Sequence, residues 1–462
     1  MINENQNSPQ QPSRRTSPLL SIATFVGVVL GAIVFICGVV LLLFPSLFAN
    51  RFVKPELMTA LDGAFPEYSV YMGDMHYSLF TNQLTCDSVS VMAVDGSFSG
   101  RLGPITLTGI GWRHLLGGGT PDPRVFSEAR IEAEDIKIFL QKKNYTVQCD
   151  WLTISVPDSD MVAESIEVRP QGGDEQFFRG DAFRVTRFRI SIPEVRVKGV
   201  AVRDLAEGKA YRARSATIQD ALLDVMVNKD KPNTVHSSRP IMPGEMLASM
   251  QESLRVDSLI VLNGRMVYKE RFAVGEKPAR ITFDNIQMQI AGISNDGDSS
   301  VPVVVHAQWN LANAGVMKLL MFFPVASPDW TFQYSGSLAA MELSALNPFL
   351  EVSDLMRVKE GSLQGVTFDI DIEGGVARGN VTGTYTNLTL AAISKVSGSE
   401  DGFSDGLKSF MANNFKIRRN NEANKKKPMK IGEVKYTREL DDPFIRTVWF
   451  SLRTGVRDVV GF

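Results

Sequence analysis

Ala133-Glu134-Asp135-Ile136-Lys137-Ile138 is one copy of a short pattern that decides the fold of this 462-residue chain. The pattern consists of an apolar residue, two residues that are mostly polar, an apolar residue, any residue and a final apolar residue. Strict alternation of apolar and polar residues predicts a β-strand with one buried face, but here the alternation slips by one position at an Asp, Glu or Asn. The other copies begin at Cys86, Cys149, Ile192, Ile218, Val256, Phe283 and Tyr385.

A slip of this kind would turn the second half of each strand inside out unless the backbone absorbed the extra residue. A β-bulge absorbs one residue, and it also bends the strand and increases its twist. The repeated pattern therefore predicts a mainly β protein. We expect one long, curved, antiparallel sheet with a single apolar face, accompanied by a few short helices.

One hairpin can be placed in register from the sequence alone. Apolar and polar residues alternate over residues 366–373, and Gly374-Gly375 provides a two-residue turn. Small residues then fall opposite large ones, which predicts a shallow trough along the apolar face. The expected pairs are Ile372–Ala377, Ile370–Gly379, Phe368–Val381 and Val366–Gly383 on the apolar face, and Asp371–Arg378, Asp369–Asn380 and Thr367–Thr382 on the polar face.

The N-terminal region carries the signature of a membrane anchor. Thr16 to Asn50 contains no Asp, Glu, Lys or Arg, and residues 19–48 are long and apolar enough to cross a membrane as a helix. A cleaved signal peptide is the alternative, but its apolar region would be shorter and no A-x-A cleavage site follows. We therefore expect an uncleaved, single-pass anchor preceded by a disordered tail over residues 1–18. Its orientation stays open because the basic residues on its two sides balance.

The rest of the chain divides at a Pro-rich, polar stretch, Asn228 to Gly244. The apolar stretch Leu311 to Val325 is expected to form a helix packed on the sheet. The expected segments are a linker helix over 49–67, an N-terminal β-groove over 68–235, a C-terminal β-groove over 236–440 and an amphipathic helix over 441–462.

The C-terminal helix is predicted from apolar residues that recur at three- and four-residue spacing. Its three Arg residues lie mainly towards the other side. The apolar stripe either packs on the end of the sheet or docks on a membrane surface or a partner, and Trp449 is the candidate contact in the second case. The stripe consists of Phe444, Ile445, Val448, Trp449, Leu452, Val456, Val459 and Val460.

The sequence offers little chemistry for catalysis. The four His residues are scattered without metal-ligand spacing, and no phosphate-binding loop or nucleophile motif is present. A net charge of −2 argues against nucleic acid as a partner. We expect no enzyme, and accordingly no catalytic residue, metal or cofactor. Cys86 and Cys149 could pair if the domain is exported.

Three stretches of the chain resemble the AsmA-like family, which includes the TamB-related bridge-type lipid transfer proteins. The resemblance extends to the uncharacterised AsmA-like domain of many envelope proteins. It covers only part of the chain, and its motifs carry no invariant catalytic group. The stretches are Val70 to Val91, Ser253 to Ile293, and Leu346-Asn347-Pro348-Phe349 through Leu390 together with Phe444 to Gly461.

The resemblance implies a helix in the bacterial inner membrane with the bulk of the chain in the periplasm. It also implies a curved, taco-like sheet whose apolar groove binds or transfers phospholipid through its acyl chains and supports outer-membrane assembly. Other envelope proteins are candidate partners, and the basic residues Lys425, Lys426 and Lys427 are candidate contacts for headgroups or partners. The candidate lipid contacts in the groove are Phe283, Ile286, Met288, Ile290, Phe368, Ile370, Ile372, Val381 and Tyr385.

Two other functions stay open at this point. In the first, loops and helices fill the groove and the protein is an envelope scaffold that transports nothing. In the second, suggested by the terminal Phe462, the strands form an outer-membrane β-barrel, although the aromatic residues are too irregular for the expected girdles.

Overall fold

In the computed structural model of the chain, the described residues begin at Pro45 and continue with short gaps. They are 45–111, 126–206, 210–232, 240, 242–250, 252–295, 301–324, 330–393, 417–423, 428–439 and 442–461. The predicted tail over residues 1–18 and nearly all of the predicted anchor over residues 19–48 lie outside them. Within these ranges, no helix is long and apolar enough to cross a membrane.

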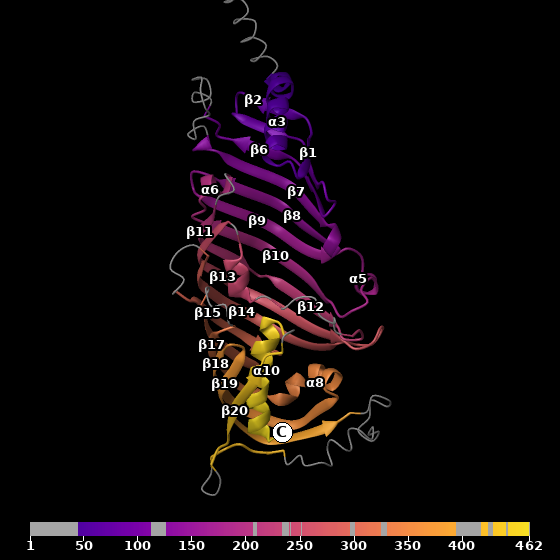
Figure 1. Cartoon of the computed structure of the whole chain (residues 1–462), viewed down its shortest axis with the longest axis vertical. Helices are drawn as coiled ribbons and strands as arrows, with labels where there is room; N and C mark the ends of the chain where they lie inside the picture. The colour runs from indigo at the N-terminus through magenta and orange to yellow at the C-terminus, as the bar shows by residue number, and fades with distance from the viewer. Residues whose placement is uncertain are drawn as a thin grey trace, which may run out of the picture.

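The chain is mainly β, as the alternating pattern predicts, and its strands form one 20-stranded sheet that is elongated and curved (Figure 1). The strands are β1 (Tyr68–Met72), β2 (Met75–Ser78), β3 (Gln83–Cys86), β4 (Val89–Ala93), β5 (Phe98–Leu102), β6 (Ile105–Thr108), β7 (Arg130–Leu140), β8 (Tyr145–Ser155), β9 (Asp160–Pro170), β10 (Thr186–Lys198), β11 (Ala210–Gln219), β12 (Leu222–Asn228), β13 (Ser253–Arg271), β14 (Ala279–Ser294), β15 (Val303–Leu311), β16 (Gly315–Phe323), β17 (Phe332–Glu342), β18 (Met356–Glu373), β19 (Val376–Ala392) and β20 (Ile431–Thr437). The helical segments are α2 (Pro45–Phe48), the π-helical turn η1 (Ala49–Val53), α3 (Lys54–Ala64), η3 (Gln141–Lys143), α5 (Asp174–Arg179), α6 (Val202–Ala206), α7 (Pro243–Ala248), η4 (Leu343–Leu346), α8 (Asn347–Ser353) and α10 (Phe444–Val460).

Neighbouring strands follow chain order along most of the sheet and pair antiparallel. The prediction of a wholly antiparallel sheet is wrong at one place, because β11 and β12 both pair with β13 in parallel. A parallel step needs a long crossover, and the connection from β12 to β13 supplies one that contains α7. The predicted boundary between residues 235 and 236 falls in this connection. Because β12 and β13, on its two sides, pair with each other, both predicted grooves belong to one continuous sheet.

In two places, two consecutive short strands lie end to end and pair with the same neighbouring strand. β5 and β6 both pair with β7, and β11 and β12 both pair with β10 and β13. At the level of these junctions, a line of residues runs across the sheet, and several of them have left-handed φ angles. The angles are 50° at Asp135, 53° at Asp220, 53° at Asn263 and 52° at Asn285. Asp and Asn tolerate this conformation better than most L-residues. We call this line the crease. Asp135, Asp220 and Asn285 occupy the third position of the repeated pattern, so the slip in the sequence is a bend in the backbone.

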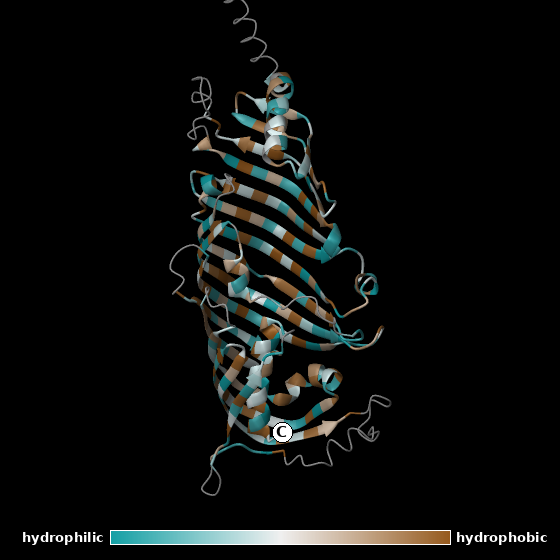
Figure 2. Cartoon of the chain, viewed as in Figure 1, coloured by the Kyte–Doolittle hydropathy of each residue, from teal (hydrophilic) through white to brown (hydrophobic). Residues whose placement is uncertain are grey.

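Because the alternation slips at the crease, apolar side chains stay on the same face on both sides of it, and we call this face the inner face. Figure 2 shows the resulting bands of alternating hydropathy along the strands. At about 4.8 Å per strand, the longest apolar row across the sheet extends ~70 Å. Row A consists of Tyr77, Leu84, Leu107, Ile131, Ile154, Met161, Val197, Ala216, Leu259, Ile290, Val305, Met321, Tyr334, Ile370, Gly379 and Val434, and row B beside it includes Cys86, Ile105, Ala133, Leu152, Ala163, Val195, Ile218, Val261, Met288, Ala307, Leu319, Gly336, Phe368, Val381 and Gly432.

Helices cover the inner face at the two ends of the sheet (Figure 1). At the N-terminal end, Met58 and Leu61 of α3 pack against a buried cluster formed by Met72, Met75 and Cys86 with Ala49 of η1. At the C-terminal end, α10 packs over β18, β19 and β20 and completes the largest hydrophobic core. The two ends of the apolar face are therefore sealed by the chain itself.

One further sequence-based expectation is corrected by the structure, and one question that the sequence left open, the pairing of Cys86 and Cys149, is answered. The predicted helix over Leu311 to Val325 is wrong, because residues 311–323 form the end of β15, a turn and strand β16, and Val325 lies outside the described residues. A continuous apolar run has no periodicity that distinguishes a helix from a strand. Cys86 and Cys149 are both free and buried, and β6 and β7 lie between their strands. The predicted linker helix over residues 49–67 corresponds to η1 and α3.

Candidate functional site

Row A passes from an open part of the inner face to a covered part. From β7 to β14 its side chains are all partly exposed, whereas in β15 and beyond Val305, Met321, Tyr334 and Ile370 are at least nine-tenths buried. The row is apolar throughout, so the difference arises from what lies above it. We call the inner face from β7 to β14 the open groove, and it is the candidate functional site.

Apolar residues line the open groove on both sides of the crease. Beyond the crease a third row, row C, repeats the composition of rows A and B. The outer face of the same strands carries charged residues such as Glu132, Glu167 and Arg196. The groove is therefore apolar on one face only, and the crease bends it between row B and row C. Row C consists of Ile138, Val147, Val168, Ile190, Leu223, Met266 and Phe283.

The four predicted lipid contacts in β14 lie on the inner face at the border of the open groove. Met288 and Ile290 extend rows B and A, and both also pack against the core cluster at the C-terminal end. Phe283 and Ile286 lie on opposite sides of the crease, Phe283 in row C and Ile286 next to row B. They share the inner face although three positions separate them, because the backbone slips at Asn285. All four side chains are partly exposed.

The other five predicted lipid contacts share the inner face but are covered. The register of the hairpin is the predicted one, with Phe368 opposite Val381 and Ile370 opposite Gly379. Ile370 and Ile372 are fully buried, and Tyr385 is 3% exposed. Burial raises the pKa of Tyr385 to about 12, so its hydroxyl stays protonated and donates to the carbonyl oxygen of Arg418 at 2.9 Å. Lipid contact at these five residues stays a prediction, and it would require α10 to move.

A trough of small residues brings α10 unusually close to the sheet. The sequence predicts this trough from Gly379 and Gly383, and Gly432 on β20 extends it. A Cβ atom on Gly432 would lie 2.1 Å from the carbonyl oxygen of Gly455, and one on Gly455 would lie 2.4 Å from a methyl group of Val381. The helix backbone therefore rests directly on the strand, and only glycine fits at both positions.

The contact face of α10 differs from the predicted apolar stripe. Thr447, Ser451, Gly455 and Val459 recur at four-residue spacing and are buried against the sheet. The Ser451 hydroxyl lies 2.9 Å from the Tyr334 hydroxyl, which satisfies both groups within the core. Phe444, Val448, Leu452 and Val460 pack beside this line.

Three residues of the predicted stripe point away from the sheet. Ile445 is 73% exposed, Trp449 is 53% exposed and Val456 is 39% exposed. The prediction of a single apolar stripe is therefore wrong, because small residues, not large ones, make the closest contact. The other predicted headgroup contacts, Lys425, Lys426 and Lys427, lie outside the described residues.

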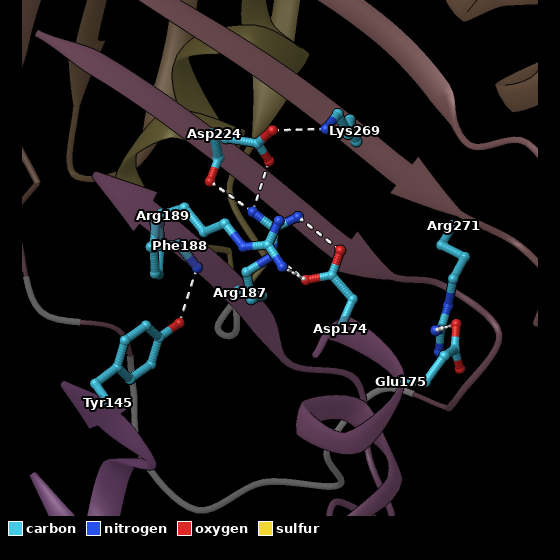
Figure 3. Close-up of polar contacts among 9 residues, drawn as sticks. All are labelled: Tyr145, Asp174, Glu175, Arg187, Phe188, Arg189, Asp224, Lys269 and Arg271. Carbon is cyan, nitrogen blue, oxygen red and sulfur yellow. Dashed lines mark hydrogen bonds and ion pairs between the residues drawn. The ribbon is translucent and has the colours of Figure 1, made fainter. Parts of the chain in front are cut away.

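An ionic cluster around the buried Arg187 fastens α5 to the sheet at strands β10, β12 and β13 (Figure 3). Arg187 on β10 is fully buried, and its guanidinium contacts Asp174 at 3.0 Å and Asp224 at 2.6 Å. Lys269 on β13 contacts the second oxygen of Asp224 at 2.6 Å. Burial alone would raise the pKa of the Asp224 carboxyl, but hydrogen bonds from Lys269 and Arg187 outweigh it and hold that pKa below its ordinary value. The cluster joins α5 to β10, β12 and β13 and stabilises one border of the open groove.

Sequence reasoning missed most of the open groove. It singled out the inner face of β14 and of the β18–β19 hairpin, whereas Val168, Ile190 and Leu223 line the open part. A signal for them was present, because the repeated pattern occurs in β7, β8, β10 and β11, and its apolar positions form rows A to C. Arg187 carries no comparable signal, because an Arg in an alternating strand usually faces solvent.

Comparisons with known proteins add no family. No protein-family model matches the chain, and no curated protein matches it. Within the ranges described above, no group of three or more His, Cys, Asp or Glu residues is arranged to hold a metal ion.

Proposed function

We propose that the chain binds phospholipid acyl chains in the open groove and transfers them along it. The observation that carries this proposal is the change of exposure along row A, which is apolar and partly exposed from β7 to β14 and buried beneath protein beyond. A wide apolar surface in contact with water marks a binding site. An acyl chain that covers it gains about 25 cal/mol for each Å² removed from water.

The dimensions of the open groove suit this ligand. From β7 to β14 the rows cross six strand spacings, which is ~30 Å at about 4.8 Å each. The hydrocarbon core of a bilayer is about 30 Å thick for two leaflets, so one acyl chain needs about half of that length. The open groove is long enough for acyl chains to lie along it in more than one position.

The proposed setting follows from the sequence. Residues 19–48 anchor the protein in the bacterial inner membrane by a single pass, and the sheet lies in the periplasm. The resemblance to the AsmA-like family supports both points, and the curved one-sided sheet agrees with it. The protein then supports assembly or homeostasis of the outer membrane, with no enzymatic activity and no cofactor.

A phospholipid with a photoreactive group in its acyl chain tests the proposal. The full-length protein is reconstituted in vesicles that contain this lipid, irradiated and digested, and mass spectrometry locates the adducts. We expect adducts on the inner face from β7 to β14. Ile190→Glu, which places a charge in row C, should reduce them severalfold. Ser191→Glu, on the outer face of the same strand, should not. Adducts spread equally over both faces would refute the proposal.

The scaffold function remains the second candidate, and a specific observation favours it. The chain's own helices already cover the inner face at both ends. In a scaffold that binds no lipid, we expect the chain or its protein partners to cover the whole inner face and exclude water from it. Absence of any acyl-chain adduct in the open groove would support the scaffold over lipid transfer.

A further inference from the structure

An uncharged hairpin lies at the N-terminal end of the sheet, next to the point where the predicted anchor ends. Strands β2 and β3 and the turn between them cover Met75 to Cys86, and this stretch contains no Asp, Glu, Lys or Arg. At the tip of the turn, Leu79 is 38% exposed and Phe80 is fully exposed. Leu79 and Phe80 together form an exposed apolar tip on a hairpin without Asp, Glu, Lys or Arg, and exposed apolar patches mark interaction sites.

The turn is held in shape by hydrogen bonds. The Tyr77 hydroxyl donates to Asn82 Oδ1 at 3.0 Å, and Asn82 Nδ2 donates to the carbonyl oxygen of Ile110 at 2.9 Å. Asn82 itself adopts a left-handed φ of 49°, which closes the turn. The exposure of Phe80 is therefore imposed by an ordered turn.

The same hairpin is attached to the residues that follow the predicted anchor. Asn50 Nδ2 donates to the carbonyl oxygen of Met75 at 2.7 Å, and its Oδ1 accepts from the Met75 N–H at 2.9 Å. The Ser46 hydroxyl accepts from the Tyr77 N–H at 3.2 Å. Leu47, adjacent to Ser46, is 60% exposed. Leu47, Leu79 and Phe80 thus belong to two segments that hydrogen bonds join, and we call these three residues the apolar rim.

These hydrogen bonds also satisfy the free edge of the sheet. β2 pairs only with β3 among the described strands, so its outer edge would otherwise present unpaired backbone groups. Such groups are costly near the hydrocarbon of a bilayer. With Asn50 and Ser46 bound to them, the edge strand carries neither a charge nor an open N–H at Met75 or Tyr77.

We propose that the apolar rim inserts into the interfacial layer of the bilayer that holds the anchor. The occupant follows from chain continuity, because Ser46 and Asn50 belong to the charge-free run Thr16 to Asn50 and hold the hairpin at its end. Row A begins at Tyr77 in this hairpin, so insertion places the start of the apolar rows at the membrane surface. The inference rests on the proposed anchor and deepens the proposed function, since it sets the N-terminal end of the sheet, which η1 and α3 cover, against the bilayer, with the open groove beginning beyond it at β7.

An environment-sensitive fluorophore tests the insertion. Phe80→Cys is introduced into the full-length chain together with Cys37→Ser, labelled with an NBD group and reconstituted in vesicles. Cys86 and Cys149 are buried and label poorly, and the chain with Cys37→Ser alone gives the background. The matched control is Val274→Cys, because Val274 is 66% exposed and lies in the connection between β13 and β14.

We expect the label at position 80 to shift to shorter emission wavelengths and to lose most of its intensity to nitroxide-bearing lipids. The label at position 274 should instead be quenched by iodide in the water phase. Iodide quenching of equal extent at both positions would overturn the inference. Acyl-chain adducts in the open groove with position 80 in water would refute only this inference. A label at position 80 within the bilayer without such adducts would refute only lipid binding in the groove.

Discussion

Replacing Gly432 by Ala should detach α10 from the sheet. The added Cβ would lie 2.1 Å from the carbonyl oxygen of Gly455, whereas carbon and oxygen normally approach to about 3.3–3.6 Å. The obstacle is helix backbone and cannot rotate away as a side chain could, so the helix itself must shift by more than about 1 Å. Overpacking of this kind typically costs about 1–3 kcal/mol.

Gly383→Ala is the matched control for this prediction. Gly383 lies on the same face under the same helix, and both glycines have an ordinary negative or extended φ. A Cβ on Gly383 would meet Val366 and Val459 at 3.7 Å, which is normal van der Waals contact. This substitution should therefore leave α10 in place or stabilise it slightly.

Hydrogen exchange of the peptide that covers residues 444–460 measures the effect directly. A cost of about 1–3 kcal/mol raises the opening equilibrium of α10 by about 5- to 150-fold, so its amides should exchange faster by that factor in Gly432→Ala. Exchange in β7 to β10 serves as an internal reference and should not change. Equal protection of α10 in both variants would refute the close contact between Gly432 and Gly455.

Other parts of the structure give further predictions. Arg187→Met should cost about 1–3 kcal/mol because it leaves two partly buried carboxylates with fewer partners, whereas Arg189→Met, at a half-exposed position, should cost less than about 1 kcal/mol; thermal unfolding of both variants compares them. Asn285→Val should cost about 1–2 kcal/mol because a β-branched residue disfavours a left-handed φ, whereas Asn285→Gly should be nearly neutral, and a similar loss in both would contradict the crease. The pKa of Asp224 is lowered in the folded state, so its stabilisation is present at neutral pH and is lost as pH falls below the ordinary carboxyl range, near about 4. Below that range, the melting temperature of the wild type should fall towards that of Asp224→Asn, and a difference that stays constant from neutral pH down to pH about 2 would contradict the assignment.

The features that follow from local pattern were predictable from the sequence. The hairpin around Gly374-Gly375 has the predicted register throughout residues 366–383, because alternation and turn type together leave one pairing. The bends at Asp220 and Asn285 were also predictable, because the apolar–polar alternation slips by one residue at each of them. Without the Asp or Asn at the slip, the apolar pattern alone would not have shown where the sheet bends.

Features that depend on distant partners were not predictable. β12 and β13 pair in parallel, and the length of the connection between them does not reveal from the sequence in which direction β13 runs. The contact face of α10 was misjudged because Thr447, Ser451 and Gly455 are small and look unremarkable in sequence. Their importance arises from Gly432, a residue on a different element that permits close approach. Likewise, the division of the groove into open and covered parts depends on where α10 rests, and hydropathy alone does not reveal it.

The most direct test of lipid binding in the open groove is a photoreactive amino acid placed at single positions in cells. At Ile190, on the open inner face, we expect a phospholipid adduct after irradiation of the full-length protein. At Ser191, on the outer face of the same strand, we expect none, and at Ile370, fully buried beneath α10, none either. Equal adducts at Ile190 and Ser191, or an adduct at Ile370 without one at Ile190, would contradict the account.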